Sequence, residues 1–442
     1  MFVDEPARRT PLYGEFDVVV AGGGPAGLAA AVSAARHGAR TLLIERYGFL
    51  GGMGTAGGVT NFAGLYGKRG GETLQLVRGV VDELLERIER LGGLNVPQDG
   101  LQGRIRVRSY DIPAYKCAAD QWLASSGAQV LFHASVVDVS GEGERIDALL
   151  VETKSGRRAI RAHWFIDATG DADVAHHAGV PYELGDGHGD ALYPSTMFRV
   201  GSVDAERALA AIGTFGAIDA LMRNAADRYD FPRDGAIVRP QRNRSEWRVN
   251  VTQVANAQGR AVNATDAQQL SDGEVEGRRQ VIEYLRFLRA EVPGFERAEL
   301  IDVGTQLGVR ETRRVQGVYQ LSGDDVLSGA RFDDSIGLNA WPIERHAQGR
   351  IEWAFPRDAD NTFNQLPWRM LLPLQANNLL VTGRCASMEH EGQSAARASG
   401  ACFVMGQAAG TAVALMLQRG LAADQVAPAL QDTLRRDGVE LG

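Results

Sequence analysis

The chain has 442 residues, a formal net charge of −8 and 44% hydrophobic residues. This length suits two or three domains, and this hydrophobic content excludes a wholly disordered chain. The acidic balance argues against general nucleic-acid binding, which requires a basic surface. Glycine is over-represented: there are 53 glycines against a typical content of roughly 7%.

The cysteines and lysines narrow the class of protein. Cys117, Cys385 and Cys402 are widely spaced and form no C-x-x-C pair. A dithiol redox motif, a structural zinc site and a disulfide framework are therefore not expected, and the reducing cytoplasm is the expected location. Only three lysines occur, which disfavours Schiff-base or pyridoxal chemistry because that chemistry needs a positioned lysine. Residues 1–15 lack the apolar core of a signal peptide.

The chain begins with a predicted strand, glycine-rich turn, helix and second strand, over residues 16–21, 22–27, 28–37 and 40–45. The turn carries the pattern G-x-G-x-x-G at Gly22, Gly24 and Gly27. In this pattern the first glycine permits a tight turn, the second lets the backbone approach a pyrophosphate, and the third lets the helix pack close to the strand. The helix N-terminus also offers free N–H groups to phosphates. The strand–turn–helix order therefore predicts a dinucleotide site.

Glu45 ends the second strand, 21 residues after Gly24. A carboxylate at this position accepts hydrogen bonds from both hydroxyls of an adenosine ribose. An acidic residue here also indicates that the ribose 2′-hydroxyl carries no phosphate. The dinucleotide is therefore expected to be FAD or NAD.

The next segment, residues 48–71, is rich in glycine and has no periodicity, so we expect a loop that wraps a ligand. Two helices and three strands are predicted after it, over residues 74–91, 112–125, 130–139, 146–153 and 159–168. The last strand runs into DATGDAD, at the second place where such folds contact a bound FAD. This motif favours FAD over NAD.

From about residue 190 the glycines become fewer, and two strands and a charged helix are predicted over residues 195–200, 247–254 and 272–291. From residue 368 the glycine-rich composition returns, with a strand, a loop and a helix predicted over residues 379–382, 383–392 and 395–417. The uncharged run over residues 398–418 is dominated by glycine and alanine, which predicts a buried helix rather than a membrane span.

We therefore predict an α/β fold. Its Rossmann-like FAD-binding domain is discontinuous and is formed by both chain ends, residues 1–190 and 366–442. An α+β substrate-binding domain is inserted between them, over residues 191–365.

Several motifs together resemble a known family: GGGPAG, ERYGFLGGMGT, FIDATGDADVAHHAGV, GVRETRR and TGRCASMEHEGQSAARASGACFVMGQAAGTA. The chain resembles the FAD-dependent oxidoreductase family of the glutathione-reductase-like FAD superfamily, over most of its length. The resemblance implies a two-domain flavoprotein with FAD extended across the first domain. It implies no particular substrate, because the family is chemically diverse.

The resemblance also implies a set of cofactor contacts. The pyrophosphate would be held by Gly22, Gly24, Pro25, Ala26 and Gly27, and the ribityl chain and flavin ring by Gly52, Met53 and Thr55. On the adenosine side, Glu45 would bind the ribose, Arg46 would lie against the adenosine, the backbone of Val136 would contact the adenine, and Gly170 and Asp171 would lie nearby. Gly383 and Arg384 would contact the pyrophosphate or the ribityl chain. Many relatives in the wider superfamily, aromatic hydroxylases among them, have Gly-Asp where this chain has Gly383-Arg384. That departure disfavours a hydroxylase mechanism.

Three residues are candidates for catalysis. His390 lies in the loop before the last long helix, where it could take a proton while a hydride leaves the substrate, or serve a structural or cofactor-contact role. Arg310 could hold a substrate carboxylate by a two-pronged contact, or form a salt bridge with a neighbouring acid. Cys385 could be reactive or covalently attached to the flavin, or be a small buried apolar residue.

A metal site is not expected. The acidic and histidine residues that lie close together have irregular spacing, and adjacent histidines on a helix point apart. These residues are Asp173, His176, His177, His188 and Asp190.

The expected activity is the oxidation of a small organic substrate by hydride transfer to FAD, with oxygen or another acceptor taking the electrons. A disulfide reductase is not expected, because the chain has no second G-x-G-x-x-G and no redox cysteine pair. The alternatives are a flavin-dependent monooxygenase or reductase using NAD(P)H and, from another class, a flavoprotein that modifies tRNA. The expected partner is a small molecule, without nucleic acid or membrane, and homo-oligomerisation is left open.

Overall fold

The computed structural model describes residues 3, 7–187, 189–214 and 218–442. Within these residues a seven-stranded sheet has the order β8-β2-β1-β11-β10-β9, and β22 pairs with β11. Neighbouring strands from β8 to β11 and the β11–β22 pair are parallel, whereas β9, β10 and β11 form an antiparallel meander. The strands are β1 (Leu12–Ala21), β2 (Thr41–Ile44), β8 (Gln129–Leu131), β9 (Ser135–Glu142), β10 (Arg145–Thr153), β11 (Gly156–Asp167) and β22 (Leu379–Val381).

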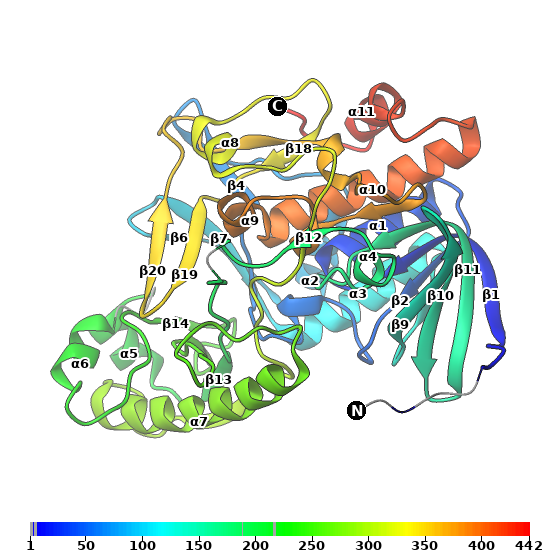
Figure 1. The fold of residues 1–442 in the computed structure, drawn as a ribbon. Coiled ribbons are helices and arrows are strands. Elements are labelled where there is room, and N and C mark those ends of the chain that lie inside the picture. Colours follow the sequence, from blue (N-terminus) through cyan, green and yellow to red (C-terminus); the bar gives the residue numbers. More distant parts are fainter. Residues whose placement is uncertain (1–2, 4–6, 188, 215–217) are drawn as a thin grey trace.

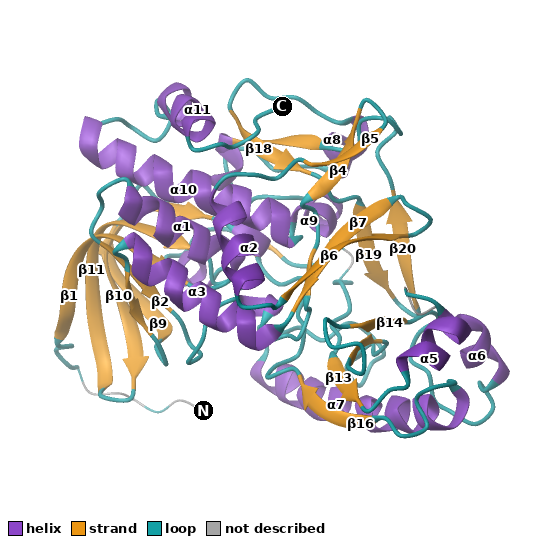
Figure 2. Cartoon of the chain, turned by 180° about the vertical axis from the view of Figure 1, so that it is seen from behind, coloured by secondary structure: helices purple, strands orange, loops and turns teal. Residues whose placement is uncertain are grey.

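A layer of helices packs on one face of this sheet, formed by α1 (Pro25–Arg36), α2 (Val80–Arg90), α3 (Ile112–Ser126) and α10 (Ser399–Arg419) (Figure 2). Strand β2 and the last four residues of β1 are buried on both faces, as in the covered centre of a parallel sheet. Strand β22, which comes from the C-terminal part of the chain, lies in the same sheet as β1. This mixed α/β architecture with a parallel sheet confirms the predicted fold class.

Helix α10 packs directly on α1 because glycine replaces larger side chains at the contact. A Cβ added at Gly406 would lie 2.0 Å from the carbonyl oxygen of Ala26, and one added at Gly410 would lie 2.1 Å from that of Ala30. These glycines therefore serve close helix–helix packing. Helix α10 is the one described helix long and apolar enough to cross a membrane, and 94% of its most apolar window is buried inside the protein.

We expect Gly410→Val to lower the free energy of unfolding by about 3 kcal/mol, because the new side chain meets rigid backbone. Urea denaturation followed by circular dichroism measures this change. The matched control is Ala211→Val, at an exposed helical position of α5, which should change stability by less than about 1 kcal/mol. Equal stability of the two variants would contradict the close-packing explanation.

A second unit has its own antiparallel sheet, with strand order β14-β15-β13-β16, and its own hydrophobic cluster. Figure 1 shows it at the lower left, with α7 running beneath the sheet. Trp247, Tyr284 and Phe287 are fully buried in this cluster. The elements of the unit are β13 (Phe198–Gly201), α5 (Ala205–Ile212), α6 (Asp219–Asn224), β14 (Ile237–Pro240), β15 (Trp247–Asn250), α7 (Ala267–Glu291) and β16 (Glu299–Val303).

Further small sheets lie outside the helical layer, some between it and the second unit and some above it, on the side away from the second unit (Figure 2). They are formed by β3 (Asn61–Phe62), β6 (Leu94–Gly100) and β7 (Ile105–Tyr110), by β4 (Tyr66–Arg69) and β5 (Glu72–Gln75), by β18 (Ser335–Asn339) and β21 (Asn364–Pro367), and by β19 (Ile343–Ala347) and β20 (Arg350–Ala354). Ile336, Ile343 and Leu366 share one hydrophobic cluster with α1 and α10. This part of the predicted insertion thus packs on the first unit, and the boundaries at residues 190 and 365 stay predictions.

The remaining elements are short or close to the C-terminus: η1 (Gly52–Gly54), α4 (Asp173–His177), β12 (Tyr182–Glu183), β17 (Arg314–Val315), α8 (Gly323–Ser328), η2 (Trp368–Leu371), η3 (Gly383–Cys385), α9 (His390–Ala396) and α11 (Ala427–Arg436).

Four predicted elements need correction. The predicted loop over residues 48–71 contains η1, β3 and β4. The helix predicted over residues 74–91 begins only at Val80, because the φ of Gly79 is +98° and interrupts it. The strand predicted over residues 130–139 is two strands, β8 and β9, separated by His133 with φ +52°. The helix predicted over residues 395–417 is divided between α9 and α10, since Ala398 is extended.

Candidate functional site

One cavity of about 1330 Å³ extends from the glycine turn after β1 to the sheet of the second unit. We call its two parts the dinucleotide end and the substrate end. The dinucleotide end is lined by Gly22–Ala26, Glu45, Val136 and Gly383, among others. The substrate end is lined by residues of β7, β14, β15 and β19 and of the segments preceding β14 and α10. Two units therefore contribute to a single site.

The glycine turn leaves the dinucleotide end open. Gly22 has a φ of +99°, and a Cβ at Gly27 would lie 1.8 Å from the carbonyl oxygen of Gly22, so both are required for the tight turn. At Gly24 the nearest atom to an added Cβ is the Cα of Gly52, 3.8 Å away. Helix α1 begins here, with Pro25 in its first turn and no side-chain cap. Its first N–H groups are therefore left for a ligand.

Two backbone hydrogen bonds hold the Glu45 carboxylate at the wall of the dinucleotide end. Its Oε2 accepts a hydrogen bond of 2.7 Å from the Gly23 N–H, and its Oε1 accepts one of 2.9 Å from the Tyr47 N–H. Burial raises the pKa of Glu45, and the backbone donors and Arg46 oppose that shift. The carboxylate keeps further acceptor capacity toward the cavity that it lines.

These features fit an extended dinucleotide such as FAD. A glycine turn without Cβ atoms faces an uncapped helix start, and a fixed carboxylate lies at the end of the next strand. Tyr115 adds a buried hydroxyl without a hydrogen-bond partner at the wall of the same cavity. The residues present are therefore of the type and placement that FAD requires.

Most residues expected to contact the cofactor line the cavity: Gly22, Gly24, Pro25, Ala26, Glu45, Arg46, Gly52, Met53, Val136, Gly170, Gly383 and Arg384. Gly27, Thr55 and Asp171 lie behind the lining instead. Thr55 Oγ1 donates to the carbonyl oxygen of Leu50 at 2.8 Å, which secures the loop that carries Gly52. These three residues shape the wall, and the individual cofactor contacts stay predictions.

Asp171 explains the departure at Gly383-Arg384. Its Oδ1 accepts a hydrogen bond of 2.8 Å from Arg384 Nη2, and its Oδ2 lies 3.6 Å from Arg46 Nη1. Thr312 also donates to Asp171, at 2.9 Å. The guanidinium of Arg384 is thus neutralised by an acid from the other glycine-rich motif, and both side chains are largely buried.

Two of the three catalytic candidates do not line the cavity. His390 Nδ1 lies 3.0 Å from Glu311 Oε1, and the same carboxylate pairs with Arg314. Cys385 is fully buried among apolar residues, and burial raises the pKa of its thiol well above the usual value. Neither residue is placed to contact a substrate in the cavity. This placement favours the alternatives given for them, a structural contact for His390 and a small buried residue for Cys385, and their catalytic roles stay predictions.

Arg310, the third candidate, does line the substrate end. Its Nη1 donates to the carbonyl oxygen of Tyr193 at 2.6 Å and to Ser195 Oγ at 2.8 Å. Glu311 instead pairs with Arg314 and His390, so the salt bridge weighed as an alternative for Arg310 does not form with its neighbour. Burial, together with the charges of Arg397 and Arg233, lowers the pKa of Arg310 well below its usual value.

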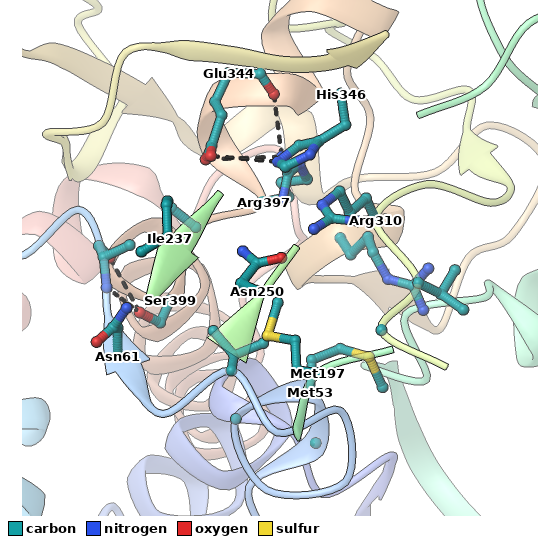
Figure 3. A pocket seen from close by; sticks show the side chains of 18 of the residues that line it. Met53, Asn61, Met197, Ile237, Asn250, Arg310, Glu344, His346, Arg397 and Ser399 are labelled. Carbon is teal, nitrogen blue, oxygen red and sulfur yellow. Dashed lines mark hydrogen bonds and ion pairs between the residues drawn. The ribbon is translucent and has the colours of Figure 1, made fainter. Parts of the chain in front are cut away.

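A carboxylate–histidine pair lies at the substrate end and was missed by sequence reasoning. His346 Nε2 lies 3.3 Å from Glu344 Oε1, and Glu344 Oε2 accepts a hydrogen bond of 3.0 Å from the Trp341 indole. Figure 3 shows Glu344, His346, Arg397 and Arg310 gathered on one side of the cavity. The sequence signal was the spacing E-x-H in a strand, which places both side chains on one face.

The protonation states of this pair follow from its surroundings. Burial alone would raise the pKa of Glu344, but the hydrogen bond from His346, the charge of Arg397 and the hydrogen bond from Trp341 outweigh it and lower the value to about 2. Burial, reinforced by the Arg310 charge, lowers the pKa of His346 well below its usual range. At neutral pH the site therefore holds a neutral imidazole beside an ionised carboxylate.

Further residues complete the substrate end. Trp341 and Trp353 line the cavity, whereas Trp247 and Trp368 belong to hydrophobic clusters.

Of the acidic and histidine residues that were weighed as a metal site, His188 lies outside the described residues. In the part of the chain that the structure covers, no group of three or more His, Cys, Asp and Glu residues could hold a metal ion.

Comparison with known proteins gives the following similarities. A family model described as FAD dependent oxidoreductase matches residues 17–436. Among curated proteins, the thiamine thiazole synthase of Methanococcus vannielii is 31% identical over 170 residues, which are 36% of this chain and 58% of that protein. That of Methanococcus maripaludis is 28% identical over 172 residues, 37% of this chain and 59% of that protein. The chain thus spans less than two thirds of these relatives.

Two solved structures are similar over most of the chain. A geranylgeranyl bacteriochlorophyll reductase-like protein from Thermoplasma acidophilum is 13% identical, with a TM-score of 0.49, 96% of this chain and 83% of that chain covered. A myxobacterial chondrochloren halogenase is 16% identical, with a TM-score of 0.49 and coverages of 96% and 80%.

Proposed function

Because the chain belongs to the FAD-dependent oxidoreductase family, we propose that it oxidises a small organic substrate at the substrate end of the cavity. Two electrons and one hydrogen leave a substrate carbon as hydride, and a proton leaves a neighbouring O–H or N–H group. FAD, when bound, supplies the ring that accepts the hydride. Oxygen or another acceptor then takes the electrons.

The observation that carries this proposal is the His346–Glu344 pair in the same cavity as the glycine turn. A neutral imidazole is a competent proton acceptor at neutral pH. Glu344 holds the ring through Nε2 and stabilises the imidazolium that forms when His346 takes the proton. Arg397 donates to the Glu344 carbonyl oxygen at 3.1 Å and so holds the residue that orients the base.

The pH dependence of substrate oxidation follows from the lowered pKa of His346. The neutral ring is the active form, and it becomes protonated only when the pH falls through a pKa that lies below the ordinary 6.5. We therefore expect kcat/KM to stay level from pH 6.5 upward and to decrease only at lower pH. Anaerobic flavin bleaching, measured by stopped flow between pH 5 and 8, tests this. An acid limb centred above pH 6.5 would show that another group is the base.

The proposed function is tested by the visible spectrum of the purified protein. We expect a yellow protein that releases FAD on denaturation and is bleached anaerobically by a small organic substrate. A colourless protein that takes up no added FAD would overturn the proposal. Bleaching by NADH or NADPH alone would favour the monooxygenase or reductase alternative.

A further inference from the structure

Besides Arg239, four arginines place buried side chains at the substrate end. Arg233, Arg248 and Arg310 have exposures of 2%, 3% and 6%, and the Arg397 side chain is 15% exposed. All four line the cavity. Within the described residues, the one ion pair that any of the four forms joins Arg397 to Glu344, with an N–O distance of 3.9 Å. The positive charge at this end therefore exceeds its buried negative charge.

Several of their N–H groups have no hydrogen-bond partner. Arg233 Nη1, Arg248 Nε and Arg397 Nε are buried donors without an acceptor. The bonds that Arg233 does make go to the backbone carbonyl oxygens of Asn250 and Val251 and to the side-chain oxygen of Asn250. Arg248 donates to the sulfur of Met197 at 3.2 Å, and its Nη1 lies 2.9 Å from the Asn61 side-chain amide. Because these hydrogen-bond acceptors are neutral, the positive charges of Arg233 and Arg248 are not compensated by them.

Burying an uncompensated charge is costly, so a protein that retains several at a cavity wall has a reason to do so. Burial lowers the pKa of Arg248 to about 10, the direction expected when no anion is present. The acidic residues that line this end besides Glu344 are exposed at its rim and do not reach the buried donors: Asp99, Asp219, Asp230 and Asp234. An anion from outside the protein would satisfy the donors.

The four arginines are held by two parts of the structure, the surroundings of the His346–Glu344 pair and strand β15, and the charges of Arg233 and Arg248 also act on Arg310. Arg310 and Arg397 lie near the His346–Glu344 pair, since both lower the pKa of His346 through their charge. Arg248 belongs to β15, and Arg233 bonds to the backbone at the end of the same strand. Arginine presents a planar fork that holds a carboxylate by two parallel hydrogen bonds.

We infer that the substrate is a small dicarboxylate, with one carboxylate between Arg310 and Arg397 beside His346 and the other against Arg233 and Arg248. This inference rests on the proposed function and names the substrate class of that site. The two anchors orient the carbon skeleton between them, so that the group losing its proton faces the imidazole.

Equilibrium binding tests the inference without turnover. Isothermal titration of the FAD-loaded protein with malonate, succinate and glutarate is compared with butyrate, succinamide and inorganic phosphate. We expect at least one dicarboxylate to bind about 10-fold more tightly than butyrate and to perturb the flavin absorbance, whereas succinamide does not bind. Dicarboxylates that bind no more tightly than butyrate, or phosphate that binds more tightly than every dicarboxylate, would overturn the inference.

Variants then assign the binding to the guanidinium groups. Arg248→Met removes a charge whose side-chain partners are a thioether and an amide. We expect about 10-fold weaker dicarboxylate binding, with an unchanged or higher melting temperature without ligand. The matched control, Arg357→Met, lies at an exposed position outside the cavity and should bind as the parent does. A folded Arg248→Met variant with unchanged affinity would contradict the inference.

A second variant covers the case in which Arg248→Met does not fold. Arg310→Lys keeps the charge but loses the fork, and we expect it to weaken dicarboxylate binding about 10-fold. Unchanged affinity in that variant would again contradict the inference. Failure of the proposed function is distinguishable, because it appears as absence of FAD. A yellow protein that is bleached by neutral substrates and ignores dicarboxylates overturns only the substrate class.

Discussion

Replacing Gly24 with valine should leave a folded protein that no longer holds FAD. The backbone of Gly24 has φ −70° and ψ −177°, which valine readily adopts. The nearest atom to a Cβ at this position is 3.8 Å away, so the core tolerates the change. The added side chain projects into the dinucleotide end, where it excludes a pyrophosphate from the start of α1. We expect FAD affinity to decrease by about 100-fold or more.

Flavin content after gel filtration and titration of the apoprotein with FAD measure the effect of Gly24→Val. Circular dichroism and urea denaturation establish that the variant is folded. The matched control is Ala124→Val, at an exposed position of α3 outside the cavity. If Gly24→Val retains FAD at the parental level, the cofactor does not bind at the start of α1.

Replacing His346 with glutamine should lower kcat by about 10³-fold, because general-base catalysis contributes in this range. KM should change little, since substrate binding is assigned to the arginines. Stopped-flow bleaching under anaerobic conditions isolates the step concerned. Glu344→Gln should lower kcat less than His346→Gln does. The His346 ring should then be wrongly oriented in more of the molecules, but the reaction should still occur.

Two further histidines serve as controls for this prediction. His177 is exposed and lies outside the cavity, so His177→Gln should keep the parental rate. His390→Gln breaks the contact with Glu311 and should lower the melting temperature while kcat remains within about threefold. A large kcat loss in His390→Gln together with an active His346→Gln variant would reverse the assignment made from the cavity.

The dinucleotide end was accessible to sequence reasoning because its residues are close together in the chain. Gly22, Gly24 and Gly27 lie in and next to one turn, and Glu45 directly follows β2, the strand that pairs with β1. The βαβ connection brings such neighbours together in any sequence of this pattern. The position of Gly383 and Arg384 in the cavity wall could not be predicted from neighbouring residues, because it depends on the pairing of β22 with β11. Its identification came from the family resemblance and not from local pattern.

The choice between His390 and His346 shows where local reasoning fails. The sequence favoured His390 because it precedes a glycine-rich helix, and the structure places it at the first residue of α9. The orientation of each side chain depends on partners far along the chain: Glu311 binds His390, whereas His346 pairs with Glu344 on its own strand. A sequence pattern describes spacing, and it does not indicate which face meets the cavity.

The sequence alone determined the fold class, the cofactor and the glycine turn that is predicted to hold it, because glycine conformation and strand–helix order are local properties of the chain. Only the tertiary structure identified the substrate end. Its arginines lie on separate elements, from Arg233 to Arg397, and are scattered among the 44 arginines of the chain. Their significance comes from being buried together with Glu344 as the one ion-pair partner among the described residues, and burial is decided by how distant segments pack.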